Sequence, residues 1–350
     1  MRPDVNGELT HQKLFRWYEI AGFVLIVCAV LYLLFPKDKI VNLVKKEKSN
    51  DTLIIKYIEN IKRYYNTDLD MNLMLFDKYI ATGSLDRAKE QFEYIKKRFP
   101  SYEEIPFLRY KMLKIAYFKS YDEDEKNRIR QKIAAALREI LNASRKNETY
   151  KRVYQEALSF GLYPLAKEAI RRVALSTLSP VWLEKAYDLA IQTSDTKEAI
   201  EYLKLLLKED RNNKNLYMLK LAKLYIADQQ YASASRIFEE LSEGDPVNRT
   251  AWLEESAKYA LAAKEYEKAS KLYLKAMKSV SQEKKSRYFV EAIKSLLWGN
   301  KPETAAKMAR EYKNDFISDK ESAYWMLKAA LAAGDLKLAN EISKSLAKRL

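Results

Sequence analysis

The sequence predicts an all-α fold: a transmembrane helix near the N-terminus, followed by a right-handed α-solenoid of about eight helix pairs. Three observations predict this fold. The 350 residues include only 7 Gly and 8 Pro, which is too few turn residues for an all-β chain. An uncharged apolar run lies near the start, and a short motif returns at nearly constant intervals from residue 83 onward.

The apolar run is predicted to be a transmembrane helix over residues 17–36, after a polar tail over residues 1–16. Ile20 to Phe35 carry no charge, and Trp17 and Tyr18 extend the run to a length of about 24–29 Å. A cleaved signal peptide is the first alternative, but LLFPKDK offers no small residues for cleavage. A buried core helix is the second, but this run lies beside a polar tail. The run therefore favours a retained single-pass anchor in contact with membrane lipid.

Residues 37–68 are predicted to form a juxtamembrane amphipathic linker and a capping helix. In the first part, apolar residues such as Ile40 and Val44 alternate with lysines in a pattern that suits a membrane surface. The alternative is that this part already belongs to the cap of the solenoid. Ser49, Asn50 and Asp51 are typical of a helix start, and the helix is expected over residues 52–65.

The repeated motif predicts the solenoid over residues 69–350. It occurs as Gly83, Leu85, Ala88, Phe92 and Pro100, and again as Gln229, Tyr231, Ala234, Phe238 and Pro246. Its alanine recurs at Ala166, Ala199, Ala234, Ala269, Ala305 and Ala339, at intervals of 33, 35, 35, 36 and 34 residues. A period near 34 with two helices per unit resembles the tetratricopeptide repeat. Between Ala88 and Ala166 the motif is lost, and a helix pair of unusual length is expected there.

Helix packing explains why these residue types recur. The small alanine lets the second helix of a pair approach the first, and Phe238 is expected to fill the space between neighbouring pairs. Pro246 ends its helix. A single pair cannot bury both of its apolar faces, so stacked neighbours must cover them. The Tyr, Phe and Ala positions are therefore expected to be core.

Several kinds of chemistry are disfavoured by composition. One histidine, His11, and one cysteine, Cys28, cannot build a Cys/His zinc site, a disulfide or a Ser-His-Asp site. No phosphate-cradling GxxxxGK motif occurs. The acidic run from Asp122 to Glu125 suits the start of a helix, where it complements the helix dipole. We therefore predict no catalytic residues, no metal and no cofactor. A glycan enzyme that uses surface carboxylates stays as an alternative.

The formal net charge is +15, which favours acidic partners or a lysine-rich solvated surface. No segment is basic and aromatic enough to indicate nucleic acid, so none is expected as a partner. A protein-binding role remains, as a scaffold for protein–protein assembly.

The tetratricopeptide resemblance implies where a partner would bind. In that family, partner contacts come from positions two, five, nine and twelve of the first helix in each pair. Carried over by register, these positions are Glu184, Asp188, Ile191, Leu219, Lys223, Ile226, Glu254, Lys258 and Leu261. The family's clamp for a peptide carboxylate uses Lys at position five and Asn at position nine. Here Lys151 is followed by Gln155, so binding of chaperone tails is not expected.

A second resemblance concerns residues 33–61. The run LLFPKDKIVNLVKKEKSNDTLIIKYIENI is similar to the segment after the anchor in the Pel exopolysaccharide export family. The chain lacks the alternating strand segments of that family's outer-membrane barrel. The resemblance implies an inner-membrane protein with periplasmic repeats that recruit a polysaccharide-modifying enzyme or an export component. Charges on the two sides of the apolar run are nearly balanced, so an adaptor facing the cytoplasm stays as an alternative.

Overall fold

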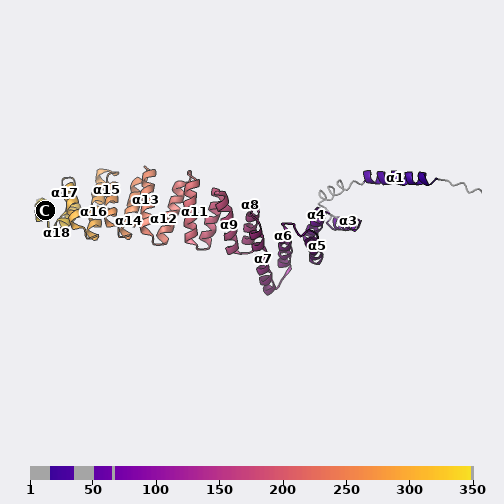
Figure 1. Cartoon of the computed structure of the whole chain (residues 1–350). Coiled ribbons are helices and arrows are strands. Elements are labelled where there is room, and N and C mark those ends of the chain that lie inside the picture. The colour runs from indigo at the N-terminus through magenta and orange to yellow at the C-terminus, as the bar shows by residue number, and fades with distance from the viewer. Residues whose placement is uncertain (1–15, 35–50, 65–67, 348–350) are drawn as a thin grey trace, which may run out of the picture. The chain divides into compact units, whose positions relative to one another are not determined.

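A computed structural model describes residues 16–34, 51–64 and 68–347. Throughout these residues the regular structure is helical, and the predicted all-helical, solenoid-like arrangement is confirmed (Figure 1). The chain divides into two compact units, residues 1–143 and residues 144–350. The predicted solenoid over residues 69–350 thus falls into two parts, and each is described by itself.

The prediction of a membrane-spanning helix over residues 17–36 is wrong. Helix α1 runs from Trp17 to Leu34 and carries Glu19 in its first turn. Its uncharged part, Ile20 to Leu34, is about 22 Å long at 1.5 Å per residue, whereas the hydrocarbon core is about 30 Å thick. None of the helices in the described ranges is long and apolar enough to cross a membrane. The predicted single-pass location in the inner membrane, with periplasmic repeats and a lipid-bound anchor, is wrong for the same reason.

The first unit continues with five further helices in its described residues. They are α3 (Asp51–Tyr64), α4 (Leu69–Ala81), α5 (Leu85–Arg98), α6 (Ile105–Lys119) and α7 (Glu123–Ala143). The predicted linker over residues 37–50 lies outside the described residues. Helix α3 packs on the first pair, because Ile54, Ile55 and Ile58 join one buried cluster with Leu75 and Phe76 of α4.

Polar contacts also join α3 to the first pair. The Lys62 ammonium donates to the Gln91 side chain at 2.6 Å, and Gln91 in turn donates to the Asn72 side chain at 2.9 Å. Gln91 and Asn72 are buried, so this chain of hydrogen bonds satisfies polar groups that water does not reach. Lys78 and Asp51 form an ion pair at 2.6 Å between α4 and the start of α3.

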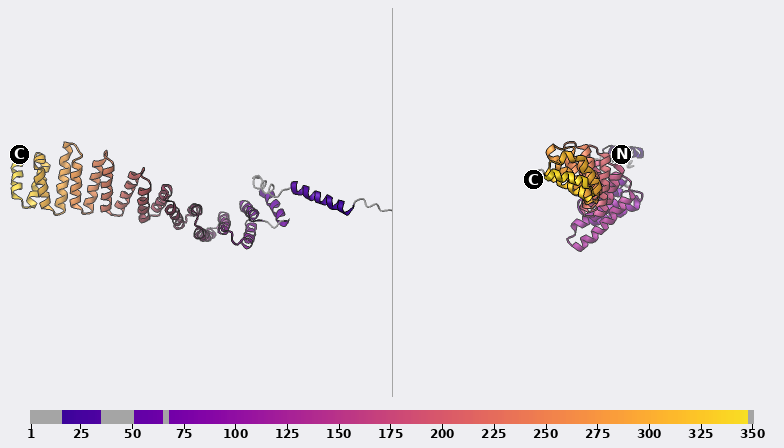
Figure 2. Two further views of the ribbon diagram at one scale, coloured as in Figure 1. Left: turned by 45° about the horizontal axis from the view of Figure 1, so that its top comes forward. Right: turned by 90° about the vertical axis from the view of Figure 1, so that its left-hand side faces the viewer.

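Over its described residues, 144–347, the second unit consists of six successive helix pairs that stand side by side in chain order (Figures 1 and 2). The pairs are α8 (Asn147–Ser159) with α9 (Tyr163–Thr177), α10 (Pro180–Gln192) with α11 (Thr196–Glu209), α12 (Lys214–Ala227) with α13 (Tyr231–Gly244), α14 (Arg249–Ala262) with α15 (Tyr266–Met277), α16 (Gln282–Trp298) with α17 (Pro302–Phe316), and α18 (Lys320–Ala332) with α19 (Leu336–Ala347). Together with α4–α5 and α6–α7, these are the eight predicted pairs.

The repeated alanine occupies one place in the pairs. It is the fourth residue of the second helix, and it is fully buried at Ala88, Ala166, Ala199, Ala234, Ala269 and Ala305 and 5% exposed at Ala339. Phe238 stacks on Trp252 and Tyr259 of the following pair, with ring centroids 6.0 and 5.5 Å away. The predicted packing of alanine within pairs and phenylalanine between pairs is therefore confirmed.

The turn between the two helices of a pair is also repeated. One residue adopts a left-handed conformation at Gly83, Gly161, Ser194, Gln229, Lys264, Asn300 and Gly334. The amide of the next residue donates back to a carbonyl five residues earlier, as Glu265 does to Ala260 at 2.8 Å. This is the Schellman arrangement, which satisfies the last carbonyls of the first helix. It explains why the motif has glycine at this position in three pairs.

The pair α6–α7 departs from this pattern, as predicted. Helix α7 has 21 residues, against 12–15 in the other second helices. Its fourth residue is Lys126 instead of alanine, and Ser120 at the end of α6 is extended instead of left-handed. The acidic run begins this helix, as expected from the dipole.

Candidate functional site

The nine predicted groove residues lie on the first helices of three successive pairs in the second unit. Helix α10 carries the first three, α12 the next three and α14 the last three. Their environments are not alike. Three apolar members are half-buried against the core, two carboxylates link neighbouring pairs, and four side chains remain exposed to solvent.

The three core members are Leu219, Ile226 and Leu261. Leu219 and Ile226 are half-buried against the cluster formed by Met218 and Phe238. Leu261 packs in the same way against the cluster that extends from α14 to α19. These side chains stabilise the stack of pairs and offer only part of their surface to a partner.

Two carboxylates connect first helices of neighbouring pairs. Glu184 of α10 accepts a hydrogen bond of 2.9 Å from the hydroxyl of Tyr217 on α12. One carboxylate of α14, Glu254, accepts from Tyr288 at 3.1 Å and from Arg287 at 2.9 Å, both on α16. Burial and the neighbouring Glu254 carboxylate raise the pKa of Tyr288, so the phenol is a donor at neutral pH. Both glutamates therefore already accept hydrogen bonds from the neighbouring helix pair.

The four exposed members are Asp188, Ile191, Lys223 and Lys258. Ile191 is 41% exposed although it is apolar. Lys258 pairs with Glu255 at 2.8 Å, and this hydrogen bond raises the pKa of the Lys258 ammonium. Asp188, Lys223 and Lys258 share one register position, and Ile191 lies three residues after Asp188 on α10. These four side chains form the part of the predicted site that a partner can reach.

The same register continues into two pairs that the sequence analysis left out. Lys294 of α16 lies 36 residues after Lys258, and Lys328 of α18 lies 34 residues after Lys294. Together with Lys223, these residues place a lysine at one position in four successive first helices. The intervals of the marker alanines, carried two pairs further, would have found them.

Aromatic and apolar side chains accompany the last two lysines. The Lys294 and Lys328 ammonium groups lie 5.1 and 4.6 Å from the ring centroid of Trp325, within the range of cation–π attraction. Beside them Trp298 is 56% exposed, Tyr324 54% and Leu331 57%. We define the first-helix face as a set of ten exposed first-helix residues of the second unit together with Lys294, whose side chain is 18% exposed. They are Val181, Asp188, Ile191, Leu216, Lys223, Lys258, Lys294, Trp298, Tyr324, Lys328 and Leu331.

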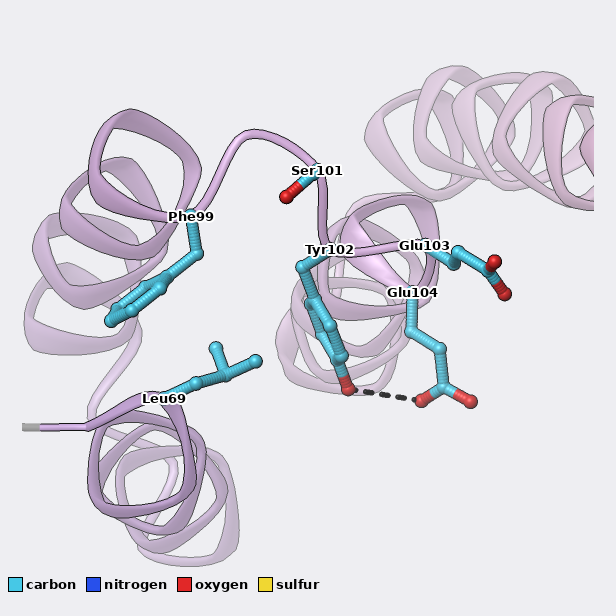
Figure 3. Close-up of a pocket in the computed structure, with 6 residues that line it drawn as sticks. All are labelled: Leu69, Phe99, Ser101, Tyr102, Glu103 and Glu104. Carbon is cyan, nitrogen blue, oxygen red and sulfur yellow. Dashed lines mark hydrogen bonds between the residues drawn. The ribbon is translucent and has the colours of Figure 1, made fainter.

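A pocket of about 480 Å³ lies elsewhere, in the first unit (Figure 3). Leu69 at the start of α4 faces Phe99 and Tyr102 from the connection between α5 and α6. The Tyr102 hydroxyl donates to the Glu104 carboxylate at 3.2 Å, and burial together with that carboxylate raises the pKa of Tyr102 to about 12. The phenol is thus protonated at neutral pH and offers a hydrogen-bond donor, not a base.

The described residues contain no group of three or more His, Cys, Asp or Glu side chains placed to hold a metal ion. On the same first helices, the carboxylates of Glu184, Glu254 and Glu255 are instead paired with tyrosine, arginine and lysine. The arrangement is thus suited to contact with another macromolecule.

Comparison with known proteins agrees with the repeat geometry. Residues 190–257 match a family model described as tetratricopeptide repeat. This range runs from the end of α10 into α14, and it includes two of the left-handed turns and the buried Ala199 and Ala234. No curated protein matches the sequence.

Several solved structures are similar to this chain at low identity. A structure of Naa15/Naa10 bound to HypK-THB is 16% identical, with a TM-score of 0.41 over 69% of this chain and 36% of that one, so this chain spans about a third of its length. A tetratricopeptide repeat protein from Parabacteroides merdae ATCC 43184 is 14% identical, with a TM-score of 0.30 over 75% and 98% of the two chains. The P58(IPK) TPR domain is 15% identical, with a TM-score of 0.26 over 89% and 96%.

Proposed function

We propose that this chain, which contains tetratricopeptide repeats, is a scaffold that binds a protein partner along the first-helix face of its second unit. The observation that carries this proposal is where apolar surface is exposed. Of eleven large apolar side chains exposed between residues 144 and 347, six lie on first helices: Val181, Ile191, Leu216, Trp298, Tyr324 and Leu331. Exposed apolar groups that gather on one face indicate an interaction site.

Packing between successive helix pairs prepares the first-helix face for binding. Each first helix is fixed by its own second helix and by the next pair, so the exposed side chains are held in place before the partner arrives. Little ordering free energy is then lost on binding. Partner affinity is expected to come from a few anchors such as Trp298 and Tyr324, since aromatic side chains dominate protein interfaces.

The involvement of the chain in polysaccharide export stays a prediction from the sequence. The likeness to the Pel exopolysaccharide export family rests on residues 33–61, of which residues 35–50 lie outside the described residues. Under this proposal the partner would be a polysaccharide-modifying enzyme or an export component. A noncatalytic role agrees with how tetratricopeptide arrays are generally used.

Site-specific photocrosslinking in the cell tests the proposal. A photoreactive phenylalanine is placed at Tyr324 of the first-helix face or, as a matched control, at Lys307, which is exposed on the second helix α17. We expect a discrete crosslinked protein from position 324 and none from position 307. Equal crosslinking from the two positions, or none from either, would contradict the proposal.

A further inference from the structure

We infer that the partner segment held on the first-helix face is extended and acidic, with carboxylates facing α12 to α18 and apolar side chains seated at Trp298, Tyr324 and Leu331. This inference rests on the proposed function, because it names the chemistry of the partner at the same site. It is carried by the charge register, by the pairing of the acidic residues, and by the spacing of the helices.

The charge register is uniform over four helices. Lys223, Lys258, Lys294 and Lys328 take the same position on α12, α14, α16 and α18. The helix before them, α10, carries Asp188 at that position. The face is thus basic over four pairs and acidic at one end, and a segment with the opposite pattern of charge could bind in only one direction.

Acidic residues form ion pairs with two of the four lysines, Lys258 and Lys294, and leave the other two for a partner. Glu254 is held by Arg287 at 2.9 Å, and Glu255 by Lys258 at 2.8 Å. Lys294 pairs with Glu291 at 2.9 Å on its own helix and with Glu321 of α18 at 3.6 Å. Within the described residues, neither Lys223 nor Lys328 has a carboxylate at ion-pair distance.

Those two unpaired ammonium groups are the strongest sites for a partner's carboxylate, because no internal ion pair has to break before they bind. Lys223 and Lys328 lie on α12 and α18, the two outer helices of the basic row. A partner segment that reaches both must therefore cross all four pairs.

Apolar anchors lie directly beside the basic row. Trp298 follows Lys294 by one turn on α16, and Tyr324 and Leu331 lie four residues before and three residues after Lys328 on α18. Residues three or four apart share one face of a helix. The surface at α16 and α18 therefore alternates apolar and basic groups, which suits a segment that alternates apolar and acidic side chains.

The helix spacing favours an extended segment. Lys294 and Lys328 come from neighbouring first helices and lie over the same Trp325 ring. Helices packed side by side are about 8–10 Å apart. Three residues of an extended chain in the polyproline II conformation cover about 9 Å at roughly 3.1 Å per residue, and every third side chain lies on the same side. A carboxylate at every third residue would therefore meet successive lysines.

The test uses the full chain and labelled peptides with capped ends. The first peptide has four Glu-Leu-Ser triplets, the second has four Lys-Leu-Ser triplets, and the third has the composition of the first with its glutamates moved together at one end. We expect saturable binding of the first peptide that weakens with added salt. The Lys peptide should not bind, and the third should bind at least several-fold more weakly.

Three variants locate the binding. Lys328→Glu and the milder Lys328→Gln are each expected to weaken binding of the first peptide, the Glu variant roughly tenfold or more. Lys307→Glu makes the same charge change on α17 and should leave binding unchanged. Equal losses in Lys328→Glu and Lys307→Glu would overturn the inference, because they would show a general effect of net charge. So would equal affinity for the first and third peptides, or tighter binding of a single-stranded oligonucleotide of equal charge.

Self-association would also overturn the stated occupant. The acidic run from Asp122 to Glu125 of a second copy is the competing occupant, and sedimentation of the wild-type chain and of Lys328→Glu at low salt detects it. We expect the same molar mass for both proteins. If position 324 crosslinks a partner whose binding survives Lys328→Glu, the proposed function stands and the acidic-segment inference fails.

Discussion

The hydroxyl of Tyr217 lies 2.9 Å from the carboxylate of Glu184, one helix pair earlier in the chain. The same hydroxyl lies 2.9 Å from Asp210 at the end of α11. Tyr217 is 1% exposed, so it links two pairs from a position that water does not reach. The predicted groove residue Glu184 therefore has a structural role in the array.

Replacing Tyr217 by Phe is expected to destabilise the second unit by roughly 1–3 kcal/mol, because two carboxylates lose the one buried donor that they share. Urea unfolding followed by circular dichroism measures this loss. Tyr324→Phe removes a hydroxyl from a side chain that is 54% exposed and should change the free energy of unfolding by less than about 0.5 kcal/mol. Similar losses in both variants would contradict the role assigned to Tyr217.

The left-handed turn at Lys264 offers a stabilising substitution. Its φ of 63° costs a residue with a side chain about 1–2 kcal/mol relative to glycine. The greater conformational entropy that glycine loses on folding offsets only part of this gain. Lys264→Gly should therefore raise the free energy of unfolding by about 0.5–1 kcal/mol, as measured by urea titration.

Gly334→Ala is the control of opposite sign. Gly334 has a φ of 71° in the equivalent turn, and a Cβ there would meet no atom within 4 Å. Any loss of stability must then come from the backbone alone, and a loss of about 1 kcal/mol is expected. A destabilised Lys264→Gly variant, or a neutral Gly334→Ala variant, would contradict the account of the turn.

Gly299 is needed for a close approach between two helices. A Cβ at this position would lie 2.5 Å from the Cβ of Tyr266 at the start of α15, where neither atom can rotate away. Gly299→Ala should lower the thermal midpoint through a loss of about 1–3 kcal/mol. Gly244→Ala, at the end of α13 with open space around it, should be neutral or slightly stabilising. Equal midpoints for the two variants would refute the close approach.

Asp245 makes stability depend on pH. Hydrogen bonds from Asn248 and Trp252 lower the pKa of its carboxyl below the ordinary 3.8, so the folded state favours the carboxylate. This stabilisation is present above pH 3.8 and is lost as the pH falls through the lower, folded value. Thermal midpoints measured from about pH 6 to pH 2 should therefore fall less steeply in Asp245→Asn than in the wild type. Equal slopes in Asp245→Asn and in the wild type would contradict this role of Asp245.

The fold was largely predictable because the packing rule is local. A small residue is needed wherever two helices of a pair approach, so Ala199, Ala234 and Ala269 mark the register before any coordinates are known. The turn position was less visible. Gln229 and Lys264 adopt the conformation that glycine adopts at Gly83, and stacked helices on both sides hold them there.

The site was predictable only in part. Register alone placed Leu219 and Glu254 in the groove. Whether such a side chain is free to bind a partner depends on its packing in the array: Leu219 packs against a hydrophobic cluster, and Glu254 accepts a hydrogen bond from Tyr288 of the next pair. Lys294 and Lys328 were missed because the register was carried through only three pairs. The prediction of a membrane helix was wrong because the run was judged by its apolar character together with its two aromatic residues, whereas the described helix, Trp17–Leu34, includes Glu19.

The most direct test of the central claim uses the protein recovered by crosslinking at Tyr324 and measures its affinity for the purified full chain. Tyr324→Ala combined with Leu331→Ala removes two exposed apolar anchors of α18 and should weaken binding by roughly tenfold or more. Tyr163→Ala combined with Leu175→Ala removes similar exposed side chains from the second helix α9 and should leave the affinity unchanged. Unchanged affinity in the first variant, with a loss in the second, would contradict binding on the first-helix face.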